Sequence, residues 1–326
     1  MSLGAIFLNC RWPARGLELR ADEQAGCRLG ESIAPAAANC PKHFPLICMS
    51  PFESNCEFAK LVAGRRGINL VQFMLEVAED AYPDLDRVGC LVEIDRLGVA
   101  CHDSLERRAC AGARERLEAV SRLLYEVEGF HGNREAYYEP QNSYLNEVLR
   151  RRAGIPISLG ILYMAVAARS GLRVFGVNTP GHFVVGCCDG EQTLFVDPFN
   201  GGDVLDQRAC LCRIRQMVGQ GACLSETDFR AAAPADIAAR VLRNLKAAYA
   251  MEDRWPLLLG VQQRLAQLLP QVPQERRDLG LVYLRLGQPG KALPLLEEYR
   301  RTCGMAQASA LEPSLQAARR MIAESN

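Results

Sequence analysis

The segment 159–168 places the strongest constraint on the fold, because none of its residues carries a charge. A helix that is apolar on every side is stable only when it is buried, and we expect this one to lie against a sheet. Ser158 stands immediately before it in an N-cap position, and Gly171 follows where helices often end in a left-handed residue. The sequence therefore predicts a buried central helix between Ser158 and Gly171.

Three short strands are predicted after this helix, each bounded by turn-forming residues. They cover residues 173–177, 182–187 and 193–196, and Asn-Thr-Pro-Gly and Asp-Gly-Glu turns separate them. A buried helix followed by closely spaced strands indicates an α+β fold, in which the helix packs on a small antiparallel sheet.

The overall composition is that of a globular protein of about two domains. The 326 residues are 49% hydrophobic, and 38 Lys and Arg are balanced by 38 Asp and Glu. Because the net charge is zero, nothing global favours binding to nucleic acid or to anionic lipid. Since no apolar run reaches the roughly 18 residues of a membrane span, we expect a cytoplasmic protein that contacts neither membrane nor nucleic acid directly.

The fourteen cysteines are scattered through the sequence without the spacing of a disulfide framework, which predicts reduced thiols. The close pairs are Cys187-Cys188 and Cys210-x-Cys212. Adjacent residues on a strand point to opposite faces, so Cys187 and Cys188 make a poor pair of zinc ligands. We expect neither a metal site nor a cofactor.

Three regions follow from the pattern of the whole sequence. Residues 1–48 hold no lasting helix or strand periodicity, and we expect either a disordered extension or a mis-assigned start, with translation beginning at Met49. Residues 49–230 contain a helical layer and then the core, and residues 231–326 are helical again. In the layer, 105–127 predicts one long helix ended by Gly129, and the Glu79-Asp80 pair and His102 read as solvated side chains.

Four motifs occur in one order between residues 133 and 202. They are Asn142-Ser-Tyr-Leu-Asn-Glu-Val-Leu, Gly154-Ile-Pro-Ile-Ser-Leu, Pro180-Gly-His-Phe and Asp197-Pro-Phe. The stretch resembles the bacterial SirB-type family of transglutaminase-like proteins. The resemblance implies a papain/transglutaminase-like α+β core, an N-terminal helical layer and C-terminal tetratricopeptide-like (TPR-like) repeats, and it names no substrate.

The repeats can be tested on the residues alone. Leu245 and Leu279, and likewise Tyr249 and Tyr283, are 34 positions apart, which is the period of a tetratricopeptide repeat. Lys246 is large where the first copy requires a small residue, so the repeat is degenerate. Two copies and a tail helix near 315–322 are too few for a free solenoid, and we expect them to pack on the core.

The core motifs supply candidate site residues. Thiol chemistry needs a thiolate near the positive end of a helix, a histidine beside it, and a carboxylate or amide that holds the imidazole. His182 and Asp197 fit the last two roles, because on adjacent strands they can lie side by side. The resemblance to a transglutaminase core, counted back from Gly171, implies a nucleophile slot at residues 156–158. Ser158 has the only nucleophilic side chain there, and no cysteine is near. The catalytic candidates are therefore Ser158, His182 and Asp197.

Ser158 is open to two interpretations: a nucleophile aided by His182 and the helix amides, or an N-cap worth about 1 kcal/mol to the helix. Tyr144 and Asn146, from the first motif, either line the same cleft or lock the preceding loop to the core. A serine in place of a cysteine usually disables such a site.

The sequence therefore favours a non-catalytic binding or regulatory protein whose repeats contact a protein or peptide partner. The alternative is a protease-like or amidase-like hydrolase or acyltransferase that uses Ser158, His182 and Asp197. A transcription factor that contacts DNA directly finds no support, since there is neither a helix-turn-helix signal nor a basic stripe.

Overall fold

The computed structural model describes residues 56–190, 192–218 and 226–325. The expectations for residues 1–48 and for a start at Met49 lie outside the described residues.

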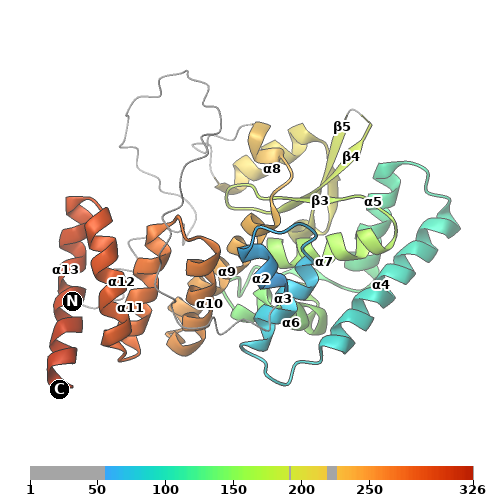
Figure 1. Ribbon diagram of the computed structural model, residues 1–326. Coiled ribbons are helices and arrows are strands. Elements are labelled where there is room, and N and C mark those ends of the chain that lie inside the picture. The colour runs from blue at the N-terminus through green and yellow to red at the C-terminus, as the bar shows by residue number, and fades with distance from the viewer. Residues whose placement is uncertain (1–55, 191, 219–225, 326) are drawn as a thin grey trace.

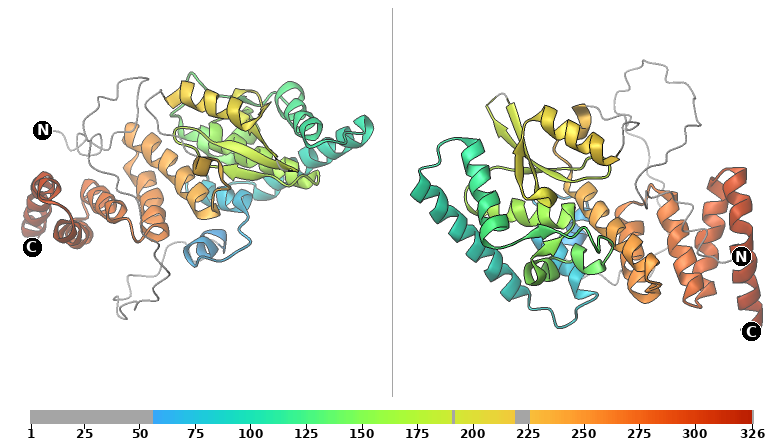
Figure 2. Two further views of the ribbon diagram at one scale, coloured as in Figure 1. Left: turned by 90° about the horizontal axis from the view of Figure 1, so that it is seen from above. Right: turned by 180° about the vertical axis from the view of Figure 1, so that it is seen from behind.

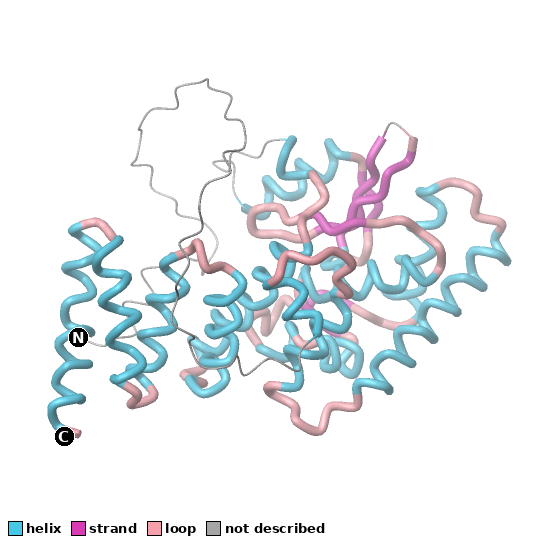
Figure 3. The backbone as a smooth tube through the Cα atoms, in the orientation of Figure 1, coloured by secondary structure: helices cyan, strands magenta, loops and turns pink. Residues whose placement is uncertain are grey.

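The predicted central helix is α7 (Pro156–Arg169), and almost its whole length is buried. It packs against β4, a middle strand of a four-stranded antiparallel sheet in the order β3-β4-β5-β6. The strands are β3 (Phe175–Val177), β4 (Val184–Asp189), β5 (Gln192–Asp197) and β6 (Asp203–Leu205). Figure 1 shows α7 beneath this sheet, and the tube in Figure 3 sets the strands apart from the helices around them. The predicted α+β core is confirmed.

Helix α7 begins earlier than the sequence indicates. Its N-cap is Ile155, and Pro156 occupies the first helical position, where a missing N–H costs nothing and the ring fixes a helical φ. Ser158 therefore lies in the first turn, so the expectation of Ser158 as the N-cap is wrong. Further along, Gly160 lets α7 approach the sheet, because a Cβ on it would lie 2.5 Å from the ring of Phe183.

The two faces of the sheet bury different side chains, as strand alternation requires. Val185 and Val196 belong to the large core around α7. Val184 and Phe195, which point the other way, pack with Ile214 of α8 (Gln207–Val218) in a smaller cluster. The sheet is thus covered by α7 on one face and α8 on the other (Figure 2).

An N-terminal helical layer surrounds α7. It consists of α2 (Cys56–Val62), α3 (Leu70–Glu79), α4 (Arg87–Arg108), α5 (Ala113–Ser121), a π-helical turn (Arg122–Val127) and α6 (Leu145–Arg151), with a short parallel pair between β1 (His131–Gly132) and β2 (Ala153–Gly154). The expected single helix over 105–127 is wrong. Ala109 adopts a left-handed conformation with φ of 50°, which ends α4, and the extended Gly112 precedes α5.

The C-terminal region consists of five helices among the described residues. They are α9 (Pro234–Met251), α10 (Trp255–Leu268), α11 (Pro273–Arg285), α12 (Pro289–Thr302) and α13 (Met305–Glu324). Leu242, Leu245 and Leu265 of α9 and α10 belong to the same hydrophobic cluster as α7. Helices α11 to α13 share a cluster of their own, around Leu281 and Leu296, and extend away from the core (Figure 1). The first helix pair thus packs as part of the core.

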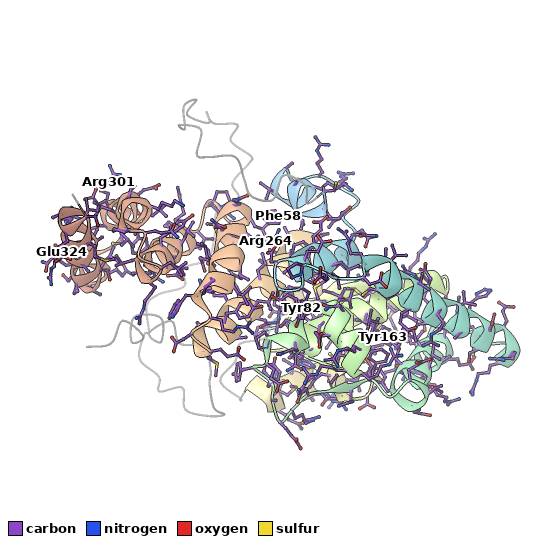
Figure 4. All side chains as sticks on the ribbon, turned by 90° about the horizontal axis from the view of Figure 1, so that it is seen from below. Phe58, Tyr82, Tyr163, Arg264, Arg301 and Glu324 are labelled. Atoms are coloured by element: carbon purple, nitrogen blue, oxygen red, sulfur yellow. The ribbon has the colours of Figure 1, made fainter. Side chains whose placement is uncertain are left out.

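An ion pair between a buried arginine and a partly exposed aspartate joins α10 to the helical layer. The side chain of Arg264 is fully buried and donates to both carboxylate oxygens of Asp80, at 2.9–3.1 Å. Its guanidinium also lies 5.1 Å from the ring centroid of Phe58, and Figure 4 shows the two side chains at this junction. Asp80 keeps part of its side chain in solvent, as expected, and it is also ion-paired with Arg264.

A second ionic cluster explains the degenerate first repeat. Lys246 Nζ lies 2.9 Å from Glu275 Oε2 and 2.6 Å from Asp278 Oδ2, and both carboxylates are almost fully buried. Lys246 thus provides an ionic link between the first and second repeats.

Candidate functional site

His182 and Asp197 lie side by side at one end of the sheet. His182 precedes β4 and Asp197 ends β5, so the antiparallel pairing of the two strands brings the side chains together. The His182 Nε2 atom is 2.8 Å from Asp197 Oδ1, and neither side chain is exposed to solvent. This is the base and orienting carboxylate arrangement of nucleophilic hydrolases.

The environment of Asp197 holds it as a carboxylate. Burial raises its pKa, but the His182 hydrogen bond and charge, the Asn200 side chain and the Arg213 charge outweigh burial and leave the pKa below its ordinary value. Asn200 Nδ2 donates to Asp197 Oδ2 at 2.7 Å, and Arg213 lies 3.6 Å from the same oxygen. A negative Asp197 orients the imidazole through Nε2.

The turn before β4 fixes the position of His182. Its backbone N–H donates to the Thr179 carbonyl at 3.2 Å, and Thr179 Oγ1 donates to the His182 carbonyl at 2.9 Å. Gly181 has φ of 68°, a value that glycine adopts without strain. The second ring nitrogen, Nδ1, is buried and has no hydrogen-bond partner among the described residues. Nδ1 is thus the nitrogen left for a nucleophile.

Ser158 does not supply that nucleophile in this structure. Its Oγ lies 2.6 Å from the Asn142 carbonyl, to which it donates, and accepts the Ile155 N–H at 3.1 Å. The Ile155 carbonyl is also 3.1 Å away, and the side chain is fully buried. No hydrogen bond joins Ser158 to His182 in the described part of the protein. Ser158 connects the first turn of α7 to the preceding 3-10 turn (Pro140–Ser143).

Cys210 is not suited to act as the missing thiolate. All nine cysteines in the described ranges are free, and Cys210 on α8 is close enough to Asp197 to sense its charge. Burial, reinforced by Asp197, raises the pKa of Cys210 to about 12. A thiol with that pKa stays protonated at neutral pH. Over the residues described, no group of three His, Cys, Asp or Glu side chains could hold a metal ion.

Tyr144 and Asn146 contact other parts of the core. Tyr144 is buried, its hydroxyl is hydrogen-bonded to the Tyr249 hydroxyl, and its ring meets Tyr82 edge-on at 5.3 Å. Asn146 lines an open hollow of about 430 Å³ with Tyr82 and Asp84. None of these contacts involves His182 or Asp197. Tyr144 joins α6 to α9 of the repeat region.

Two residues that contact the His182–Asp197 pair were not among the predicted site residues. Phe199 meets the His182 ring edge-on at 6.4 Å, and Asn200 bonds Asp197. The signal was present in the motif Asp197-Pro-Phe-Asn, since an Asp at the N-cap of a helical turn accepts a hydrogen bond from a backbone N–H two or three positions on, here that of Asn200 at 3.3 Å. Asn142 was noticed as part of a motif, and its carbonyl is the acceptor for Ser158.

Comparisons with known proteins agree with this architecture. Residues 90–243 match the model of the transglutaminase-like superfamily, and residues 245–323 match the tetratricopeptide repeat. No solved structure gives a significant match. No helix in the described ranges is long and apolar enough to cross a membrane.

Several curated proteins are similar to this one. A UPF0162 protein of Xylella fastidiosa is 38% identical over 247 residues, which cover 71% of this chain and 82% of that protein. Protein SirB1 of Salmonella typhimurium is 30% identical over 191 residues, covering 58% of this chain and 70% of its own length. The human F-box only protein 21 is 36% identical over 110 residues, which cover 31% of this chain and 18% of that protein. With this similarity and both family matches, the chain belongs to the SirB1-type (UPF0162) family of transglutaminase-like proteins with C-terminal tetratricopeptide repeats.

Proposed function

We propose that this protein is a non-catalytic transglutaminase-like binding or regulatory protein. The observation that carries the proposal is the bonding of Ser158, whose hydroxyl is fully buried and already engaged by Asn142 and Ile155. Tetratricopeptide repeats present surfaces for protein partners, which supports partner recognition by the C-terminal helices.

A serine nucleophile depends on a base that removes its proton during attack. The Ser158 proton points toward a backbone carbonyl, and its oxygen accepts a backbone N–H. Freeing the hydroxyl would leave the Asn142 carbonyl and the Ile155 N–H buried without partners, at about 1–3 kcal/mol each. That cost supports a structural role for Ser158.

The retained His182–Asp197 pair has a structural use in such a protein. It fixes the turn before β4 to the end of β5, and through Asn200 it also orders the turn that leads to β6. A buried pair of this kind is expensive to break, because either partner alone would leave a charge or a polar group unsatisfied.

The alternative function, a hydrolase or acyltransferase using Ser158, His182 and Asp197, is favoured by one observation. His182 Nδ1 is unpartnered in the described part of the protein while Nε2 is held by an ionised Asp197, as in a working base. This function requires Ser158 to leave its two backbone partners and reach Nδ1.

Labelling with a serine-reactive fluorophosphonate probe separates the two functions. We expect no labelling of the full-length protein, because the Ser158 hydroxyl is buried and engaged. Labelling that disappears in Ser158→Ala and in His182→Ala, but persists in Ser309→Ala, would overturn the non-catalytic proposal. Ser309 is an exposed residue of α13 and serves as the matched control. Circular dichroism of each variant checks that it is folded.

A further inference from the structure

Two arginines near the His182–Asp197 pair have no carboxylate partner among the described residues. They are Arg134, in the loop after β1, and Arg240, on α9. Most of the partly buried arginines in the described ranges form ion pairs, for example Arg152 with Glu93 and Arg264 with Asp80. Arg240, which is half-buried, therefore differs from the usual pattern, in which a cation removed from water is paired.

Arg240 lies at the junction between the repeats and the core. Its Nη1 donates to Asn178 Oδ1 at 2.5 Å and to the Thr179 carbonyl at 2.7 Å, both in the turn that carries His182. Its Nε and Nη2 donate to no described residue and are not sealed from solvent. Burial lowers the pKa of Arg240, and the nearby Tyr137 only partly opposes this. The guanidinium thus has free donors and no counter-ion within the described ranges.

Arg134 lies beside Phe199, the residue whose ring contacts His182. Its guanidinium is 5.4 Å from the ring centroid of Phe199 and donates to Asn200 Oδ1. Tyr137 lies next to Phe199, since the two rings meet edge-on at 5.9 Å. Burial raises the pKa of Tyr137, and the charge of Arg240 opposes that rise. Arg134, Phe199, Tyr137 and Arg240 are together called the strip below.

Nearby carboxylates leave both arginines unneutralised. Glu135 is next to Arg134 in sequence, and Asp236 is one helical turn before Arg240. Neither forms an ion pair with its neighbour in the described ranges, although both are exposed. Asp197 is engaged by His182, Asn200 and Arg213, as described above. The strip therefore keeps its positive charge.

We propose that Arg134 and Arg240 form a binding site for a carboxylate group of a peptide partner, beside the His182–Asp197 pair. The planar guanidinium fork matches a carboxylate in two parallel hydrogen bonds, and the Phe199 and Tyr137 rings offer contact area to the adjoining peptide. This inference deepens the proposed binding function and rests on it, since it names the chemistry of the partner. The carboxylate comes from an acidic side chain of the partner or from the partner's C-terminus.

A purely structural role accounts for part of the geometry only. If Arg240 only stabilised the Asn178–Thr179 turn, it would use Nη1 and need no further donor. That role explains neither the free Nε and Nη2 groups nor the exposed Arg134 on the same strip, which has no carboxylate partner among the described residues. A carboxylate ligand accounts for both arginines together.

Calorimetric titration of the full-length protein at constant ionic strength tests the site. The probes are N-acetyl-glutamic acid α-amide for a side-chain carboxylate, N-acetyl-alanine for a C-terminal one, N-acetyl-alanine amide as the neutral control, and inorganic phosphate. We expect saturable binding of at least one carboxylate probe and none of the amide. Arg240→Gln and Arg134→Gln should each weaken binding by roughly tenfold or more. Arg173→Gln, an exposed arginine before β3 with no ion pair in the described part, should leave it unchanged.

The outcomes are separable. No binding by either carboxylate, phosphate binding as tight as theirs, or unchanged binding in Arg134→Gln would overturn the inference. Arg134 is exposed, so its variant remains informative even if Arg240→Gln fails to fold. Fluorophosphonate labelling reports on catalysis independently, so failure of the carboxylate site and failure of the non-catalytic proposal are distinguishable.

Discussion

Replacement of Ser158 by alanine should destabilise the protein strongly. The change removes a hydroxyl that is fully buried and bonded to two backbone groups of different segments. The alanine side chain fits the same space, so the cost comes from hydrogen bonds rather than from packing.

The magnitude follows from the groups left behind. Without Oγ, the Ile155 N–H and the Asn142 carbonyl lose the hydrogen bonds that Ser158 gives them. The Ile155 carbonyl still accepts the Leu159 N–H at 3.1 Å and needs no replacement. Two buried unsatisfied groups cost about 1–3 kcal/mol each, and partial relaxation brings the expected total to about 3 kcal/mol. For a domain of this size the midpoint of thermal unfolding should fall by roughly 6–12 °C.

Ser314→Ala provides a matched control. Ser314 is equally buried, lies within α13, and its Oγ has no hydrogen-bond partner among the described residues. Removing an unsatisfied buried hydroxyl from a helix should leave stability unchanged or raise it by up to about 1 kcal/mol. Urea unfolding followed by circular dichroism measures both variants against the unmodified protein.

A Ser158→Ala variant that unfolds within about 0.5 kcal/mol of the unmodified protein would refute this reasoning. It would show that the hydroxyl is not held by its backbone partners and is free to act in chemistry. The same variant would then be the first to examine by fluorophosphonate labelling.

Two further predictions concern the junctions of the repeat helices. Arg264→Ala should cost about 2–3 kcal/mol in urea unfolding, because it removes a fully buried side chain together with its bonds to Asp80. Arg319→Ala on the surface of α13 should cost no more than about 1 kcal/mol, and equal effects would contradict the ranking. Burial raises the pKa of Glu275, but Lys246 outweighs burial and the pKa lies below its ordinary value of 4.5. The stability that Glu275 contributes is therefore complete above about pH 4.5 and is lost as the pH falls through the lower folded-state pKa. In the Glu275→Gln variant, the free energy of unfolding should fall less steeply as the pH drops below about 4.5. An unchanged slope in this pH range would contradict the assignment.

The central helix and the order of strands were predictable from sequence, because a charge-free run of that length has few stable placements. The repeat period was likewise visible in Leu245 and Leu279, since identical packing positions recur at a fixed spacing. Both signals are local or periodic.

The remaining features depend on contacts between distant segments. Asp80 and Arg264 are 184 residues apart, and each alone reads as a solvated charge. Ser158 has the position of a nucleophile in sequence, and only the three-dimensional structure reveals its bond to Asn142. The break at Ala109 was missed because alanine is a good helix former and adopts the left-handed conformation only rarely.

The shared core of α9 and α10 limits how this protein can be recombined with others. The match to the transglutaminase-like superfamily ends at residue 243 and the repeat match begins at residue 245, so both limits fall inside α9. A chimera joined there would cut a helix whose Leu242 and Leu245 pack around α7. A graft of foreign repeats must instead keep both helices and join after Leu268, where α10 ends and the second hydrophobic cluster takes over.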